Sequence, residues 1–190
     1  MKEASKKLSD TGKKTGLMVK LGEQESYIVP IYETFVVNHA ITNFEITGEV
    51  IAKYLRLLGR GSSTGPKVTD KLRKYRDRVV YVSIDPDKEP ARIKEKNIVI
   101  EREKSVGLIR ESHYMASESI FKPTLVRKDC EALDQAIVSV LGLCEVNFRR
   151  GLCNNIVVYG PAVSPGLSER LQLEIQKKFQ GAIEVNVSGL

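Results

Sequence analysis

Residues 16–33 read GLMVKLGEQESYIVPIYE. Two runs in and beside this stretch, Thr15–Leu21 and Ser26–Tyr32, are rich in the apolar and β-branched residues that favour strands. The polar stretch Gly22–Glu25 between them has the length of a hairpin turn. We therefore expect two antiparallel strands joined by this turn.

On the N-terminal side of the hairpin, residues 1–14 read MKEASKKLSDTGKK and carry few apolar side chains. Such a segment buries too little surface to offset the entropy of ordering. We expect a flexible basic leader at 1–14 and a folded lobe at 15–190. The leader lacks the apolar core of a secretion signal, and no run approaches the roughly 18 apolar residues of a membrane span, so no membrane association is expected.

On the C-terminal side, apolar residues recur at helical spacing. Thr47 can cap a helix over Gly48–Leu58, which Gly59 would end. Further helices are expected at Val68–Arg78, at Lys128–Leu143 and after Gly166, and Asp85–Lys96 is expected to be a polar, turn-rich connection. Short strands are expected at Phe35–Val37, Ile41–Ile46, Val79–Ile84, Ile98–Glu101, Val106–Ile109 and Ala182–Val187.

Near the C-terminus the chain passes from a strand through a glycine turn into a helix. Asn155–Tyr159 (NIVVY) is typical of a buried strand, and Gly160–Gly166 leads into the next helix. Such a turn lets a ligand approach the backbone and directs helix amides at anions, although glycine and proline are also the ordinary residues of any strand-to-helix turn. Strands followed by alternating helices and strands predict an α/β fold with helices packed on a sheet.

The formal net charge is +6, and much of the surplus lies in Lys2–Lys20 and Lys67–Arg78. Solvated surfaces explain such runs most simply, and nucleic-acid binding and anionic protein partners are the less favoured alternatives. Cys130, Cys144 and Cys153 form no CxxC pair, which favours half-buried or buried core thiols in an intracellular protein over disulfides or a zinc site. No local signature pairs any of them with the two histidines for catalysis.

Several blocks of the sequence, in the same order, resemble the actin family. Residues 16–33 resemble the second phosphate-loop hairpin and the strand after it. His39–Ile41, Thr47–Leu55 (TGEVIAKYL), Arg76–Val82 (RDRVVYV), Ser117–Pro123 (SESIFKP) and Asn155–Arg170 (NIVVYGPAVSPGLSER) resemble later family segments, the last being the adenosine segment. The resemblance implies an α/β, actin-like (ribonuclease-H-like) ATPase lobe. It would carry a smaller, mostly helical insert subdomain at approximately 47–125 and would be incomplete relative to the family.

The resemblance also implies a nucleotide pocket whose remaining residues would be Gly22, Arg76, Asp77, Gly160 and Gly166. Arg76 and Asp77 stand where the family has a Lys-Glu pair beside adenine. The departures fall on the same site. Where actins have Asp-Ser-Gly-Asp-Gly in the hairpin, this chain has Lys20 in place of the carboxylate near the metal, and a lysine offers Mg²⁺ no oxygen ligand.

Two further departures concern the water and the adenosine. Tyr27 replaces a histidine that positions the attacking water, and Pro161 replaces a glycine and removes an amide donor. The chain also has no segment like the family's first phosphate loop. Since phosphoryl transfer needs clamped phosphates, a metal and a positioned nucleophile, we expect no enzymatic activity, no catalytic residue, no metal site and no cofactor.

The resemblance leaves three roles open. The first is a non-catalytic structural subunit of a larger assembly, with other protein subunits as partners, actin or actin-related proteins among them, in the cytoplasm or cytoskeleton rather than the nucleus. The second is a subunit that binds ATP or ADP once another chain completes the site. The third is a basic scaffold that contacts nucleic acid through Lys67–Arg78.

Overall fold

A computed structural model of the chain describes residues 2–58, 66–95, 111–181 and 183–189; for 66–71, 94 and 95 it describes the backbone alone. The strands are β1 (Gly16–Leu21), β2 (Ser26–Tyr32), β3 (Phe35–Val36), β4 (Thr42–Phe44), β5 (Ile156–Tyr159) and β6 (Val187–Gly189). The helices are α1 (Lys2–Asp10), α2 (Gly48–Leu58), α3 (Pro66–Val79), α4 (Glu89–Glu95), α5 (Ser112–Glu118), α6 (Leu133–Leu143), α7 (Val146–Cys153) and α8 (Leu167–Phe179), with 3₁₀ turns η1 (Asn38–Ala40) and η2 (Pro123–Val126).

The strands form one six-stranded mixed sheet with the order β3-β2-β1-β5-β6. β4 pairs with the first residues of β2, and β3 pairs with its last residues. β1 and β2 are antiparallel, as the hairpin predicted, and Gly16 lies opposite Ile31. β5 lies parallel to β1 and β6 parallel to β5. All four residues of β5 are buried, which confirms the buried strand predicted from NIVVY.

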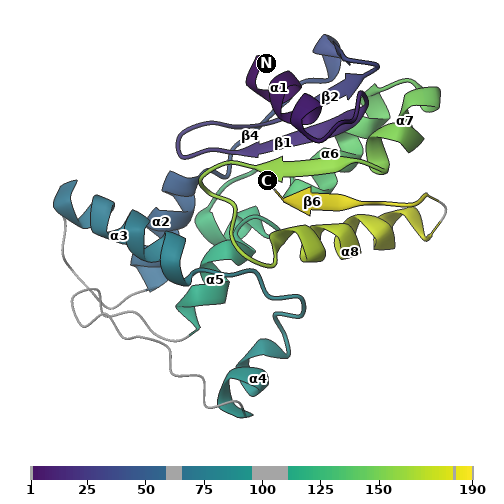
Figure 1. The fold of residues 1–190 in the computed structure, drawn as a ribbon. Coiled ribbons are helices and arrows are strands. Elements are labelled where there is room, and N and C mark those ends of the chain that lie inside the picture. Colours follow the sequence, from purple (N-terminus) through teal and green to yellow (C-terminus); the bar gives the residue numbers. More distant parts are fainter. Residues whose placement is uncertain (1, 59–65, 96–110, 182, 190) are drawn as a thin grey trace.

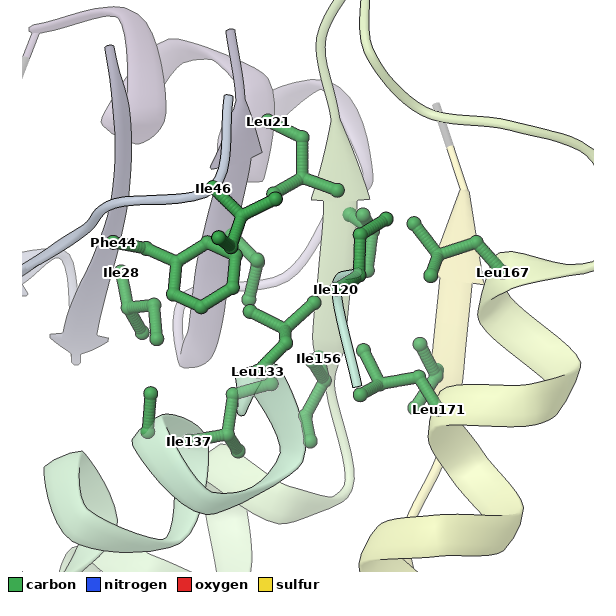
Figure 2. Packing of buried hydrophobic residues seen from close by; sticks show 14 of the residues in the cluster. Leu21, Ile28, Phe44, Ile46, Ile120, Leu133, Ile137, Ile156, Leu167 and Leu171 are labelled. Atoms are coloured by element: carbon green, nitrogen blue, oxygen red, sulfur yellow. The ribbon is translucent and has the colours of Figure 1, made fainter. Parts of the chain in front are cut away.

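The two faces of the sheet carry separate clusters of apolar side chains, because successive residues of a strand point to opposite faces. Leu17 and Val19 of β1 join the larger cluster, which α6 and α8 complete. Met18 belongs to a smaller cluster under α1. Figure 1 shows α1 on the opposite side of the sheet from α6 and α8, and Figure 2 shows the larger cluster closing between the strands and these two helices.

The N-terminal segment differs from the predicted flexible leader, because residues 2–10 form α1. Ala4 and Leu8 are spaced by one helical turn and are both buried against the sheet. The sheet supplies the apolar contacts against which these two side chains are buried. The predicted boundary between residues 1–14 and 15–190 remains a prediction.

Beside the sheet, α2, α3, α4 and α5 gather into a helical group (Figure 1), and α2 packs against α3 and α5. The helix predicted at Gly48–Leu58 is confirmed with those bounds, and the Thr47 hydroxyl accepts a 3.4 Å hydrogen bond from the Val50 amide. The prediction of an irregular Asp85–Lys96 connection was wrong in part, because α4 occupies its second half.

Other departures also have local causes. The strand predicted at Val79–Ile84 is absent from the described residues, because the segment makes single bonds to loops, such as Val82 N to Pro165 O at 2.8 Å, and no ladder. The helix predicted from Lys128 begins at Leu133, whose amide is bonded to Ile120 O, and Arg127 before it has a left-handed backbone. The last strand begins at Val187, where the prediction ended. The strands predicted at 98–101 and 106–109 lie outside the described residues.

Candidate functional site

Arg76 lies at the centre of a corner formed by the β1–β2 turn, the start of α2, the end of α3 and the loop after β5. On α3, Leu72 and Tyr75 are buried against the larger apolar cluster, and Arg76 lies one turn after Leu72 on the same helix face. Its side chain is therefore drawn inward, and it is only 2% exposed. A buried guanidinium has to find acceptors for its donors, so its partners define the site.

Two carboxylates and one carbonyl provide these acceptors. Arg76 Nη1 and Nη2 donate to the two oxygens of Glu23 at 3.1 and 2.8 Å, a bidentate pair. Arg76 Nε and Nη2 donate to Asp77 Oδ1 at 2.9 and 2.6 Å, and Nη2 also reaches the Pro161 carbonyl at 3.4 Å. Burial alone would lower the pKa of Arg76, but the hydrogen bonds to Glu23 and Asp77 outweigh it and raise that pKa.

Glu23 lies in the hairpin turn and is held from a second side by α3. Arg73 Nε lies 3.0 Å from Glu23 Oε1, so two arginines one turn apart share one carboxylate. The backbone of the same turn contacts α2: the Gly48 amide donates to Gly22 O at 2.9 Å and the Glu49 amide to Glu23 O at 3.0 Å. These amides at the start of α2 are therefore satisfied by the protein itself.

Gly160 allows the loop after β5 to close on this corner. It has φ +119°, and a Cβ at this position would collide with the carbonyl of Leu21 at the end of β1. The following loop is bonded to the same carbonyl, because the Ala162 amide donates to Leu21 O at 3.0 Å. Pro161 therefore presents its carbonyl oxygen to Arg76.

Four of the five predicted site residues thus lie around one corner: Gly22, Arg76, Asp77 and Gly160. Gly166 lies elsewhere, at the start of α8, with φ +85°, where a Cβ would collide with the Val82 carbonyl. From the sequence, no role was assigned to Glu23 or to Arg73. The spacing of three between Arg73 and Arg76, on the helix predicted at Val68–Arg78, was the signal that could have found Arg73.

Lys20, the residue at the family's metal-binding position, lies on the α1 side of the sheet. Its Nζ is 2.8 Å from Glu3 Oε2 of α1 and 5.2 Å from the centre of the Tyr27 ring, which lies opposite Lys20 in the β1–β2 register. The hydrogen bond to Glu3 raises the pKa of Lys20 against the effect of burial, and it lowers the pKa of Glu3. Helix α1, which the sequence did not predict, supplies this partner.

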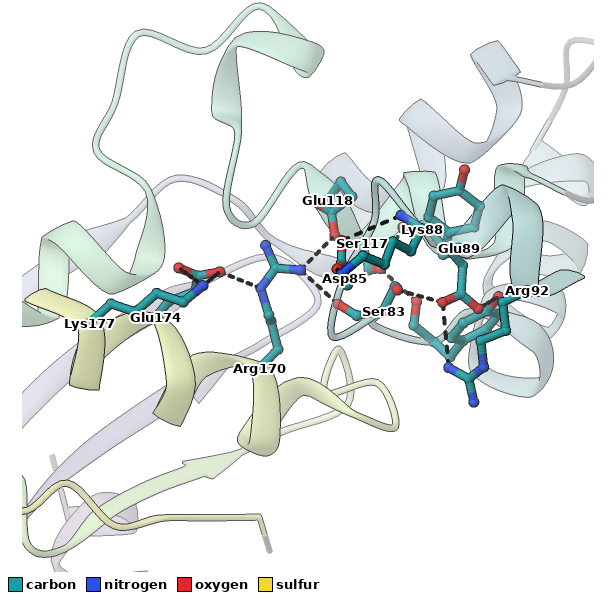
Figure 3. Close-up of polar contacts among 12 residues, drawn as sticks. Ser83, Asp85, Lys88, Glu89, Arg92, Ser117, Glu118, Arg170, Glu174 and Lys177 are labelled. Atoms are coloured by element: carbon teal, nitrogen blue, oxygen red, sulfur yellow. Dashed lines mark hydrogen bonds and ion pairs between the residues drawn. The ribbon is translucent and has the colours of Figure 1, made fainter.

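A second polar network, also missed, joins α8 to the segment before α4 (Figure 3). Arg170 donates from Nη1 to the Ser83 carbonyl at 2.8 Å and from Nε to Glu174 at 2.7 Å. The Ser83 hydroxyl donates to Glu89 at 2.7 Å, and Tyr81 donates to the other Glu89 oxygen at 2.9 Å. These side-chain hydrogen bonds, and not the ladder of the predicted strand, hold the segment Val79–Ile84 in position.

Glu118 stands at the edge of this network. It is 5% exposed, its Oε1 lies 3.8 Å from Arg170 Nη1, and neither of its oxygens accepts a hydrogen bond. Burial raises the pKa of Glu118, and the charge of Arg170 opposes the rise. A buried carboxylate without hydrogen bonds costs folding free energy when ionised, so the site favours its protonated form.

The remaining candidates have structural partners. Cys144 and Cys153 are buried and Cys130 is half-buried, which confirms their assignment to the core. His113 lies 2.7 Å from the Tyr75 hydroxyl, and His39 lies 3.1 Å from the Leu143 carbonyl. Within the described ranges, no three His, Cys, Asp or Glu side chains gather as a metal site would require, and no helix has the length and apolar character to cross a membrane.

The comparison with protein families agrees with this architecture. The family model described as actin matches residues 2–75 and 66–189, nearly the whole chain. The match includes α1, whose sequence alone gave no indication of a folded element. With its mixed sheet and flanking helices, the protein has an α/β fold of the actin type, and it belongs to the actin family.

Proposed function

We propose that this protein is a non-catalytic structural subunit of a larger protein assembly. The observation that carries the proposal is the bidentate Arg76–Glu23 pair, with Arg76 2% exposed. A cation that is to bind phosphate needs free donors, and a carboxylate that is to organise a metal needs free oxygens. Here each group neutralises the other inside the corner where phosphate would be expected.

The family implies ATP and Mg²⁺, and the donor set of this chain does not fit them. Lys20 offers no oxygen ligand, and Glu3 holds it in an ion pair. The amides at the start of α2, which could have met an anion, are bonded to the turn carbonyls of Gly22 and Glu23. The residues at this corner therefore support no phosphoryl-transfer step.

The proposal is tested by isothermal titration of the purified chain with ATP and Mg²⁺, together with a phosphate-release assay. We expect neither binding at micromolar concentrations nor turnover. Micromolar or tighter binding together with turnover by this chain alone would contradict the proposal. Glu23→Gln is an informative variant, because it frees donors of Arg76; a gain of nucleotide binding in this variant alone would support internal neutralisation as the cause.

The partners of such a subunit would be other proteins, actin or actin-related proteins among them, in the cytoplasm or the cytoskeleton rather than the nucleus. Affinity purification of the tagged chain from its source cells, followed by mass spectrometry, tests this part. Recovery of the same set of proteins at fixed ratios would support an assembly. A chain that elutes alone at the size of a monomer from a gentle lysate would contradict it.

A second function is favoured by one specific observation. Gly22, Arg76, Asp77 and Gly160 converge at one corner, as a nucleotide pocket completed by another chain would require. In this alternative ATP or ADP would bind only in the complex and would have to displace Glu23 from Arg76. Nucleotide released by acid from the purified complex, in a one-to-one ratio with this chain, would favour the alternative.

We further propose that α2–α5 form the insert subdomain predicted at approximately 47–125. The packing of α2 against α3 and α5, beside the sheet, supports this assignment. Limited proteolysis should then release a protected fragment with ends near these positions. Uniform digestion of the helices and the sheet would argue against a separate unit.

The nucleic-acid alternative gains no support, because the side chains at 67–71 of its basic face lie outside what the structure describes.

A further inference from the structure

A groove of about 620 Å³ runs between α2 and the 3₁₀ turn η2, on a part of the molecule that the nucleotide corner does not use. Its volume is within the range of pockets that hold a ligand. Tyr54 and Leu57 of α2 line one side, and Leu125 and Val126 of η2 line the other. These four side chains give the groove an apolar floor.

Two of the four floor side chains are exposed to solvent. Leu57 is 74% exposed and Leu125 is 39% exposed, and they face the same groove from two different elements. An isolated exposed leucine is ordinary, but two that line one concave surface gain free energy when a partner covers them. The groove therefore favours an apolar ligand side chain.

The rim of the groove is cationic. Lys53, Arg127 and Lys128 line it, and none of its lining residues is a carboxylate. Lys53 and Lys128 have acidic partners outside the groove, Glu49 and Glu45, each at 2.9 Å. Arg127 is exposed, and within the described residues it has no ion pair; its left-handed backbone, φ 55°, holds it at the end of η2.

We propose that this groove binds a short amphipathic segment of a partner protein, with apolar side chains on the floor and Asp or Glu residues facing the cationic rim. A helix with apolar residues at spacings of three and four is the kind of segment that docks in an apolar groove. Complementary charge makes the acidic form of such a helix the favoured one. Nucleic acid would satisfy the cations but would leave Leu57 and Leu125 uncovered.

The inference rests on the proposed function, since it gives the assembly a docking surface, but its test is independent of nucleotide. Randomised 14-residue peptides displayed on phage are selected against the immobilised full chain. We expect the enriched peptides to be acidic and to carry apolar residues at helical spacing. Synthetic copies should lose at least about tenfold in affinity, about 1.4 kcal/mol, to Leu57→Ser or Arg127→Glu.

Matched controls separate the groove from the rest of the surface. Leu173→Ser replaces an exposed leucine on α8, and Arg150→Glu reverses an exposed charge on α7. Neither residue lines the groove, and neither change should alter the affinity. Exchange of one acidic peptide residue for Lys should restore binding to Arg127→Glu. All the groove substitutions are at exposed positions, and circular dichroism verifies that the variants fold.

The proposal would be overturned if the selection enriched no peptides, or if it enriched neutral or basic peptides. Acidic peptides whose affinity is unchanged by substitution of Leu57 or Arg127 would also overturn it. It would also fail if a labelled duplex DNA, and no peptide, bound in an Arg127-dependent way. Titration with ATP and Mg²⁺ reports separately on the proposed function. If the chain bound peptides here and also hydrolysed ATP, the docking groove would be supported and the proposed non-catalytic role would be contradicted.

Discussion

Replacement of Arg76 by Met tests whether the corner is held by its internal ion pair. The change keeps much of the apolar stem and removes the guanidinium, so Glu23 loses a bidentate partner in a largely buried place. Removal of one member of a buried pair costs about 3–5 kcal/mol. Glu23 is 22% exposed and keeps Arg73 at 3.0 Å, and we therefore expect a loss of about 2–3 kcal/mol.

Asp77 adds little to this figure. Its side chain is 53% exposed, and solvent screens a pair of this kind until its net contribution approaches zero. The expected loss therefore comes from Glu23, and a second substitution can verify this. In a double-mutant cycle of Arg76→Met with Glu23→Gln, we expect a coupling free energy of about 1–3 kcal/mol.

Urea unfolding followed by far-ultraviolet circular dichroism provides the measurement, because the chain has no tryptophan. Lys74→Met is the matched control, since Lys74 is an exposed cation on the same helix, and its effect should stay within about 0.5 kcal/mol. A loss below about 0.5 kcal/mol in Arg76→Met, or additive effects in the cycle, would refute our account of the corner and remove the main support for the proposed function.

Three other predictions concern α1, the second network and the thiols. Leu8→Ala should cost about 2–4 kcal/mol in urea unfolding, because Leu8 is 2% exposed against the sheet, whereas the exposed Lys6→Ala should change little; equal effects would mean that α1 does not dock. Burial raises the pKa of Glu118, so the unfolded chain loses its proton first as the pH rises above the ordinary value of 4.5. Wild-type stability should then fall relative to Glu118→Gln as the pH rises above 4.5, and a difference that is constant with pH would contradict this. Burial also raises the pKa of Cys153 to about 11, so iodoacetamide should label the half-buried Cys130 first in the native protein, and early labelling of Cys153 by mass spectrometry would contradict its placement in the core.

Local patterns explain why parts of the fold could be predicted. The strands of the hairpin, the buried strand after Asn155 and the helix over Gly48–Leu58 depend on alternation, β-branching and capping, which act over a few neighbouring residues. Local patterns did not predict α1, because its two buried apolar residues, Ala4 and Leu8, are too few to indicate a folded helix without the sheet that covers them.

The candidate site was also predicted only in part. From the sequence, Gly22, Arg76, Asp77 and Gly160 were assigned to one pocket through the family resemblance, and the structure does bring them to one corner, although their binding of nucleotide stays a prediction. Gly166, assigned with them, lies against Val82 instead, because its left-handed backbone serves the start of α8.

By itself, then, the sequence determined the family, the α/β class and the hairpin, because all three depend on patterns among residues that are close together in the chain. Only the tertiary structure decided that Glu23 neutralises Arg76 and that Glu3 engages Lys20. These pairs join residues 53 and 17 positions apart, and they form because the packing of α3 and of α1 on the apolar clusters brings the paired side chains together. No local pattern encodes that choice.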